Sequence, residues 1–351
     1  MEEIFYSNTN YDITSLEVAA SCPSNIALIK YWGKYPNQIP ANPSISYTLS
    51  ACRSDTTIKF DAGKEFSVKT FLGGEQRSDF SKKIENYFRS LSLYLPWIDK
   101  GSYLIHTDNT FPHSSGIASS ASGFGALSKC LMAMDQSFGE QISAEACLRK
   151  ASFLARLGSG SACRSLYDGL VVWGETPHVK GSSDLYGVEY DINKVHPIFR
   201  SFNDWVLLIH EGEKSVSSTV GHGLMKSNPY AKTRFEEARN NFVPLTRILR
   251  EGAMKDFIAL VEHEALTLHA MMMVSAPAFI LMKTQTLEAI NRVWNFREQT
   301  GLPLFFTLDA GANLHLLFPH GPEEASIIEF IENGLLELAQ NRHVVKDKMI
   351  F

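Results

Sequence analysis

The feature that most constrains the fold is a run of small residues between Phe111 and Gly125, which is rich in glycine and serine. A segment with helical apolar periodicity follows at once, carried by Ala126, Leu127, Cys130, Leu131 and Met134. This order predicts a loop leading into the N-terminus of a buried helix, where unpaired N–H groups and the helix dipole can hold an anion. Gly116 can adopt a positive φ and let the backbone approach a phosphate closely. No Gly-Lys-Ser/Thr closes the run, so it is not a Walker loop, and a helix packed tightly against a sheet is the alternative interpretation.

The composition is that of an ordinary globular protein. The chain has 351 residues, which is enough for two domains with their own cores, and 44% of them are hydrophobic while 20% are charged. The formal net charge of −5 argues against a general nucleic-acid binder, which needs a basic face. A local cationic pocket for a small acidic substrate is compatible with this charge.

Cysteine usage and the apolar runs indicate the compartment. The five cysteines are scattered and form no CxxC pair, which favours reduced thiols over a disulfide framework or a zinc site. The N-terminus is acidic and has no apolar signal region, and no apolar run is long enough to span a bilayer. We therefore expect a soluble, cytoplasmic protein without membrane or nucleic-acid partners.

The first half of the chain combines predicted strands and helices. Period-two and apolar runs predict strands at 15–32 (with a turn at 22–24), 42–49, 56–60, 66–72, 103–107 and 170–173. The segments 56–60 and 66–72 are expected to form a hairpin, because Asp61, Ala62 and Gly63 form a turn signal between them. Helical periodicity predicts a helix at 82–95, one after the small-residue run, and one at 144–157 capped by Ser143.

The second half is predicted to be a separate α+β unit. The polar segment 181–203 suggests a boundary, so we expect domains at 1–197 and 198–351. Strands are expected at 205–210, 303–308 and 313–318, and helices at 229–250, 255–273, 284–300 and 323–340. Asp309 falls between the last two strands, where an aspartate in a hairpin turn is the simplest interpretation.

Two further motifs carry chemistry-bearing residues. The run from Gly158 to Ser165 is a second loop of small residues, and it contains Arg164, whose guanidinium suits two-point recognition of phosphate or carboxylate. The run from Asn25 to Lys34 places two lysines beside aromatic residues, as expected of a phosphate-contacting edge. A surface salt bridge for the arginine and solvated lysines at a strand end are the alternatives.

Taken together, five ordered motifs resemble the GHMP kinase superfamily and, within it, the mevalonate diphosphate decarboxylases. The motifs are Asn25–Lys34, Phe111–Gly123, Gly158–Ser165, Val216–Thr219 and Asp309–Gly311, and the resemblance covers most of the chain. It implies an N-terminal domain like ribosomal protein S5 domain 2, a ferredoxin-like C-terminal domain and an active site between them. It also implies ATP-dependent conversion of mevalonate 5-diphosphate to isopentenyl diphosphate, with ADP, phosphate and CO2, in the mevalonate pathway of isoprenoid biosynthesis. ATP and Mg2+ would be cofactors, and the protein would be a homodimer.

The resemblance assigns roles to individual residues. Asp309 would orient or accept the proton of the tertiary hydroxyl, Arg164 would hold the substrate carboxylate, and Ser120 would reach the transferred phosphoryl group. With Lys30, these are the implied catalytic residues. The implied contacts of the nucleotide are Pro112, Ser115, Gly116, Ala118, Ser119 and Ser120. Those of the substrate are Asn25, Lys30, Tyr31, Lys34, Lys83, Ser159, Gly160, Ser161, Arg164, Ser217 and Ser218.

The chain also departs from the family pattern. Pro43 stands at a usual serine, Ala312 at a usual proline, and a diphosphate-binding arginine falls by spacing on Lys83 or Lys82. Lysine supplies charge without the two-pronged donor of arginine, so a monophosphate substrate is an alternative. A kinase of the same superfamily is a further alternative, as is a non-catalytic small-molecule-binding protein. The combination of Asp309, Lys30 and Arg164 argues against the last.

Overall fold

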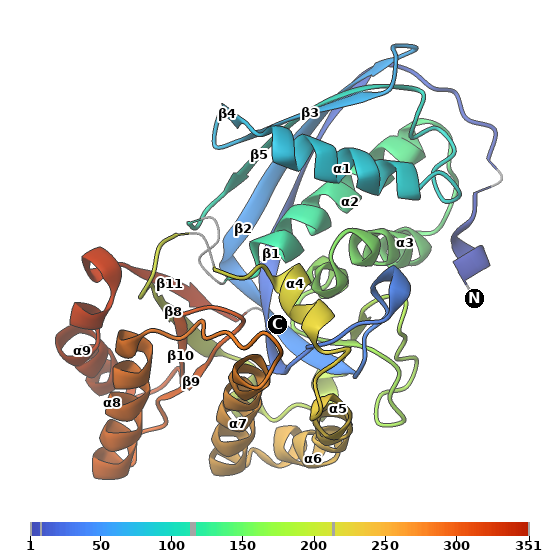
Figure 1. Cartoon of the computed structure of the whole chain (residues 1–351). Coiled ribbons are helices and arrows are strands. Elements are labelled where there is room, and N and C mark those ends of the chain that lie inside the picture. Colours follow the sequence, from blue (N-terminus) through green and yellow to red (C-terminus); the bar gives the residue numbers. More distant parts are fainter. Residues whose placement is uncertain (1, 8, 113–116, 213–214, 350–351) are drawn as a thin grey trace.

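The chain forms two β-sheets, with helices packed against each (Figure 1). The computed structural model describes residues 2–7, 9–112, 117–212 and 215–349. The larger sheet has seven strands and lies in the first half of the chain, and the smaller sheet has four strands and lies in the second half. The combination of sheets with packed helices confirms the predicted α+β class.

The larger sheet is mostly antiparallel. Its strands are β1 (Leu16–Ile29), β2 (Ser44–Ala62), β3 (Ser67–Leu72), β4 (Glu75–Gln76), β5 (Gly101–Asn109), β6 (Leu170–Trp173) and β7 (Val188–Glu189). The order is β4-β3-β5-β2-β6-β7, and β1 pairs with β2. β3 runs parallel to β5, so β5 lies between the two segments that the sequence had predicted to form a hairpin, and that prediction was wrong.

The start of the chain forms one continuous strand where the sequence predicted two strands joined by a turn. The predicted turn at 22–24 does not exist, because β1 runs without interruption from Leu16 to Ile29. The pairing with β2 shifts register between Pro23 and Asn25, as in a β-bulge. A bulge accommodates the missing N–H of a proline inside a strand. The Cys-Pro-Ser signal therefore marks an irregular strand rather than a turn.

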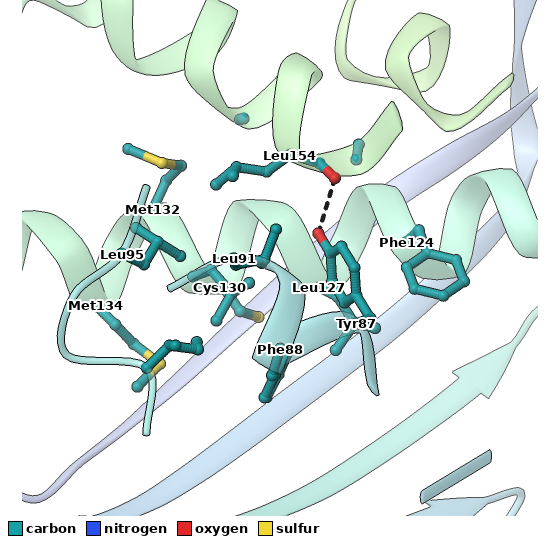
Figure 2. Packing of buried hydrophobic residues seen from close by; sticks show 14 of the residues in the cluster. Tyr87, Phe88, Leu91, Leu95, Phe124, Leu127, Cys130, Met132, Met134 and Leu154 are labelled. Carbon is teal, nitrogen blue, oxygen red and sulfur yellow. Dashed lines mark hydrogen bonds between the residues drawn. The ribbon is translucent and has the colours of Figure 1, made fainter. Parts of the chain in front are cut away.

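Three helices pack together in the core of the first half. They are α1 (Ser78–Ser90), α2 (Ser119–Ser137) and α3 (Ala144–Gly158). Their buried side chains interdigitate, and Tyr87 of α1 donates a hydrogen bond of 2.9 Å to the carbonyl of Leu154 in α3 (Figure 2). Ser143 caps α3 as predicted, accepting a hydrogen bond from the N–H of Ala146. This core fixes α2 and therefore the loop that precedes it.

The smaller sheet is covered by helices on both faces. Its strands are β8 (Phe202–Leu207), β9 (Phe305–Thr307), β10 (Leu314–Pro319) and β11 (Val344–Lys348), in the order β11-β8-β10-β9. One face packs against α8 (Thr284–Thr300) and α9 (Glu324–Gly334). The other packs against α7 (Met254–Met273), and α5 (Ala231–Asn240) and α6 (Phe242–Glu251) lie against α7, as Figure 1 also shows. α4 (Ser218–Leu224) lies between the two halves.

The second half differs from the sequence prediction in three places. The predicted helix at 229–250 is two helices, α5 and α6, and the predicted final helix ends at Gly334 rather than near 340. Strand β11 had no strong sequence signal, because its pattern is two valines followed by charged residues. It forms because it pairs with β8 and because the carboxylate of Asp347 accepts N–H groups from Ser50, Ala51 and Cys52.

Short helices and connections complete the chain. The 3-10 helices are Glu2–Phe5, Pro36–Gln38, Gly160–Leu166, Ile192–Lys194, Pro197–Phe199, Leu336–Leu338 and Gln340–Arg342. The predicted domain boundary at 197 and 198 falls between the two sheets, but a core cluster with members from both halves crosses it, so the boundary stays a prediction. In the described part of the chain, every helix is too short or too polar to cross a bilayer.

Candidate active site

Two adjoining cavities lie where the two halves of the chain meet. The first has a volume of about 450 Å3 and the second about 350 Å3. Five residues line both: Lys83, Ala118, Ser120, Ser218 and Thr219. The first cavity has apolar walls from Leu72, Phe80, Ile84, Ile105, Phe124 and Leu127. The second is lined by the polar and charged residues of the predicted motifs, so the two cavities differ in chemistry and meet at the start of α2.

The start of α2 is built from the small residues that the sequence singled out. Ala118 has a left-handed backbone with φ 47°, and Ser119 and Ser120 open the helix behind it. Ala118 and the two serines line the first cavity, whereas Pro112 lines neither cavity. The predicted contacts Ser115 and Gly116 lie outside the described residues.

Close packing also contributes to the choice of residues in α2. A Cβ added to Gly125 would lie 2.4 Å from the Sγ of Cys22 in β1, which is too close for any side chain. The two interpretations of this stretch are therefore compatible. The glycine within the helix permits close packing on the sheet, and the residues at its start line the cavities.

An ion pair joins the two halves of the chain on the wall of the second cavity. The ammonium of Lys30 lies 2.9 Å from a carboxylate oxygen of Asp309, and the two side chains are 1% and 26% exposed. Burial lowers the pKa of Lys30, and the neighbouring carboxylate opposes that shift. The backbone N–H of Lys30 donates to the buried carboxylate of Glu264, which also pairs with Arg234 and accepts from Asn241. Lys30 is thus held at both its backbone and its ammonium.

Arg164 is a buried cation in the same cavity. It lies in the 3-10 helix Gly160–Leu166, donates from Nε to the side-chain oxygen of Asn25 at 3.2 Å, and donates from Nη1 to the hydroxyl of Ser44. Burial lowers the pKa of its guanidinium. Within the described residues, no carboxylate forms an ion pair with it. Asn25 was predicted to contact substrate, but it is 2% exposed and lies behind Arg164 rather than on the wall.

Two further lysines, Lys34 and Lys83, line the same cavity. Lys34 donates to Gln38 at 2.8 Å, and the ammonium of Lys83 lies 5.1 Å from the centre of the Phe124 ring. Burial lowers the pKa of both lysines, and the charge of Lys83 lowers that of Lys34 further. Of the two lysines that spacing had left open, the structure brings Lys83 to the cavity and leaves Lys82 outside its lining. Two cations close enough for one to lower the pKa of the other favour an anion beside them.

The remaining predicted contacts complete the wall of the second cavity. Tyr31, Ser159, Gly160 and Ser161 all line it. A Cβ on Gly160 would lie 2.6 Å from the ring of Trp173, which explains the glycine. The hydroxyl of Tyr31 is buried, and among the described residues it has no hydrogen-bond partner. A bound ligand could provide that partner, since buried polar groups are nearly always paired.

Helix α4 brings the second half of the chain over both cavities. Ser217 caps it by accepting from the N–H of Val220, and Ser217, Ser218 and Thr219 line the first cavity. Sequence reasoning missed Thr219 and also His222, which lines the second cavity. If a helix had been predicted from Ser218, His222 would have been expected on the same face as Ser218, because residues four apart on a helix are neighbours.

The chain is similar to known diphosphomevalonate decarboxylases in both sequence and fold. Residues 22–184 match the family model "Diphosphomevalonate decarboxylase-like N-terminal domain". The diphosphomevalonate decarboxylase of Schizosaccharomyces pombe is 30% identical over 347 residues, which are 93% of this chain and 83% of the relative. The mevalonate diphosphate decarboxylase of Staphylococcus aureus superposes with a TM-score of 0.81 at 28% identity over 96% of each chain. The structure of MDDEF in complex with MVAPP, AMPPCP and magnesium gives a TM-score of 0.80 at 26% identity, over 95% of this chain and 97% of that one.

Proposed function

This chain belongs to the diphosphomevalonate decarboxylase family, and we propose that it converts mevalonate 5-diphosphate and ATP to isopentenyl diphosphate, ADP, phosphate and CO2. The observation that carries the proposal is the buried guanidinium of Arg164, which has no carboxylate partner among the described residues and lines the same cavity as the Lys30–Asp309 pair. The carboxylate of Asp309 acts on this guanidinium but forms no ion pair with it, and a buried cation without a direct partner is costly. A substrate carboxylate would supply that direct partner.

The reaction needs one group that handles a hydroxyl and one that handles a carboxylate. In the first step, the tertiary hydroxyl attacks the terminal phosphorus of ATP, loses its proton and releases ADP. In the second, phosphate leaves with the electrons of the C–O bond, while the electrons of the bond to the carboxylate form the alkene and CO2 departs. Asp309 orients the hydroxyl and accepts its proton, and Lys30 keeps that carboxylate in place. Arg164 fixes the direction in which the carboxylate leaves.

The two cavities fit the two substrates. The apolar walls of the first suit a nucleotide base, and Ser119 and Ser120 at the start of α2 suit its phosphates. Ser120 lines both cavities, so it can contact the phosphoryl group that passes from one to the other. In the second cavity, Lys34 and Lys83 are suited to the terminal phosphates of the acceptor.

The donor groups at this junction fit Mg2+ that is bound mainly through ATP. Within the described residues, no three His, Cys, Asp or Glu side chains cluster as a metal site. Mg2+ commonly binds through one or two carboxylates, water and substrate phosphates rather than a protein cage. Among the described residues that line the second cavity, Asp309 offers a carboxylate and Ser120 a hydroxyl suited to hold it. When bound, it would neutralise charge on the transferred phosphoryl group. The structure of MDDEF with AMPPCP and magnesium supports the proposal that this chain binds a nucleotide together with Mg2+.

The test is to offer ATP with mevalonate, its 5-phosphate or its 5-diphosphate in separate reactions, and to measure ADP and CO2 in each. We expect equal amounts of ADP and CO2. The diphosphate should be preferred, because Lys34 and Lys83 line the cavity and are suited to its two phosphates. Preference for the monophosphate would favour the alternative suggested by lysine at position 83. ADP without CO2 would indicate a kinase and refute the proposal. The homodimer and the cytoplasmic location remain predictions.

A further inference from the structure

His222 stands out among the residues of the second cavity, because sequence reasoning gave it no role. It lies on α4, is 8% exposed, and its ring centre is 4.4 Å from those of both Tyr31 and Trp32. A Cβ on the preceding residue, Gly221, would lie 2.6 Å from the Trp32 ring, so α4 approaches this aromatic pair closely. The position of the imidazole is therefore fixed by packing from two sides.

The hydrogen bonding of His222 determines its tautomer. Its Nδ1 accepts the backbone N–H of Gly33 at 2.9 Å. Burial, together with the charge of Lys34, lowers the pKa of His222 to about 3, so the ring is neutral near pH 7. A neutral imidazole that accepts at Nδ1 carries its proton on Nε2. His222 is thus a neutral donor with a defined direction.

The Nε2–H group of His222 is open to the cavity. Among the described residues it donates to no acceptor, and Nε2 is not among the fully buried polar atoms that lack a partner, so it keeps some exposed surface. Because the ring otherwise packs against Tyr31 and Trp32, that surface lies on the cavity that His222 lines. His222 lines the second cavity together with Lys34, Lys83 and Gln38. His222 lies close enough to Lys34 for that charge to lower its pKa, and the two lysines are the groups to which the terminal phosphates of the acceptor are assigned.

We propose that His222 is a further substrate-binding residue, which donates a hydrogen bond from Nε2 to a phosphate oxygen of the acceptor. The proposal rests on the function proposed above and deepens it by naming a residue that recognises the phosphate end. A neutral donor adds direction without adding a third positive charge beside the two lysines. Because Nδ1 is held by Gly33, on the segment that follows Lys30 and Tyr31, the donor keeps a fixed position relative to both.

Three variants separate the donor from the packing. His222→Asn keeps an acceptor for the Gly33 N–H and removes the distal donor. His222→Gln offers an amide donor near the position of Nε2. His222→Phe keeps the aromatic contacts with Tyr31 and Trp32 but lacks both nitrogens, and it replaces the Asn variant if that variant does not fold.

Calorimetric binding of mevalonate 5-diphosphate and of AMPPCP to the full-length protein distinguishes the outcomes. We expect His222→Asn to weaken mevalonate 5-diphosphate about tenfold, as for one hydrogen bond to a charged group, and to leave AMPPCP within about twofold. His222→Gln should recover most of the loss. Unchanged affinity of the Asn or Phe variant would overturn the proposal, and so would equal losses for mevalonate, which has no phosphate. If the parent protein did not bind mevalonate 5-diphosphate at all, the proposed function would fail instead.

Discussion

Replacing Arg164 with lysine tests whether a two-pronged donor, rather than positive charge alone, is needed at the decarboxylation site. A guanidinium has five N–H donors in a fixed plane. In the structure, one donates to Asn25 and one to Ser44, so the remaining donors are available to a substrate carboxylate. Lysine keeps the charge but cannot hold Asn25, Ser44 and a carboxylate in the same directions. We expect orientation to suffer more than attraction.

The size of the effect follows from the contacts that are lost. Loss of one charge-assisted hydrogen bond to the carboxylate costs about 1.5 to 3 kcal/mol, which corresponds to roughly 10- to 150-fold in kcat/KM. The acceptor atoms of Asn25 and Ser44 would also lose their donor inside the protein, and each buried unsatisfied group costs about 1 to 3 kcal/mol of stability. The variant should therefore be both slower and less stable, with the larger effect on the decarboxylation step.

The assay is the steady-state release of CO2 and ADP from mevalonate 5-diphosphate, combined with chemical denaturation. Arg89→Lys is a matched control, because Arg89 lies on the surface of α1 with its side chain 58% exposed, paired with Glu85 in an i,i+4 contact and placed over the Phe66 ring, where lysine keeps the charge. The control should change neither rate nor stability appreciably. If Arg164→Lys kept the kcat/KM of the parent within about twofold, the guanidinium would not orient the departing carboxylate, and the assignment would be wrong.

Three further predictions concern other parts of the site. Asp309→Asn should retain calorimetric binding of both substrates but lose turnover by about two orders of magnitude or more, and near-normal ADP release would return Asp309 to a structural turn residue. Lys83→Ala should raise KM for mevalonate 5-diphosphate about tenfold with kcat nearly unchanged, whereas Lys82→Ala should have little effect; equal effects of the two changes would contradict the assignment. Glu264→Gln should lower the free energy of unfolding by roughly 3 kcal/mol, measured in urea, because it removes the buried partner of Arg234 and leaves that cation only the more exposed Glu237.

The sequence predicted local structure well where a local signal exists. Ser143 indicated the start of α3 because an N-cap acts within one turn, and the apolar periodicity after Phe111 predicted α2. The expected hairpin after β2 was wrong, because a turn signal at 61–63 does not specify which strand pairs with which. That choice depends on β5, which follows β3, β4 and α1 in the chain and inserts between β2 and β3.

The same distinction applies to the candidate site. Arg164, Lys30 and Asp309 could be predicted because each lies in a motif that resembles a known family. Glu264 and His222 could not, since Glu264 acts through the backbone of Lys30, and His222 depends on how α4 packs on the segment after β1. Their roles arise from contacts between distant segments, for which a single sequence carries no local signal.

The most direct test of the central claim follows the oxygen of the tertiary hydroxyl. If the site phosphorylates that hydroxyl before CO2 leaves, then mevalonate 5-diphosphate labelled with oxygen-18 at this position must transfer its label to inorganic phosphate. Mass spectrometry of the released phosphate from the unmodified protein should then find one labelled atom for each CO2 formed. Label recovered in water, with unlabelled phosphate, would mean that the hydroxyl leaves without phosphoryl transfer and would contradict the account of Asp309, Ser120 and the joined cavities.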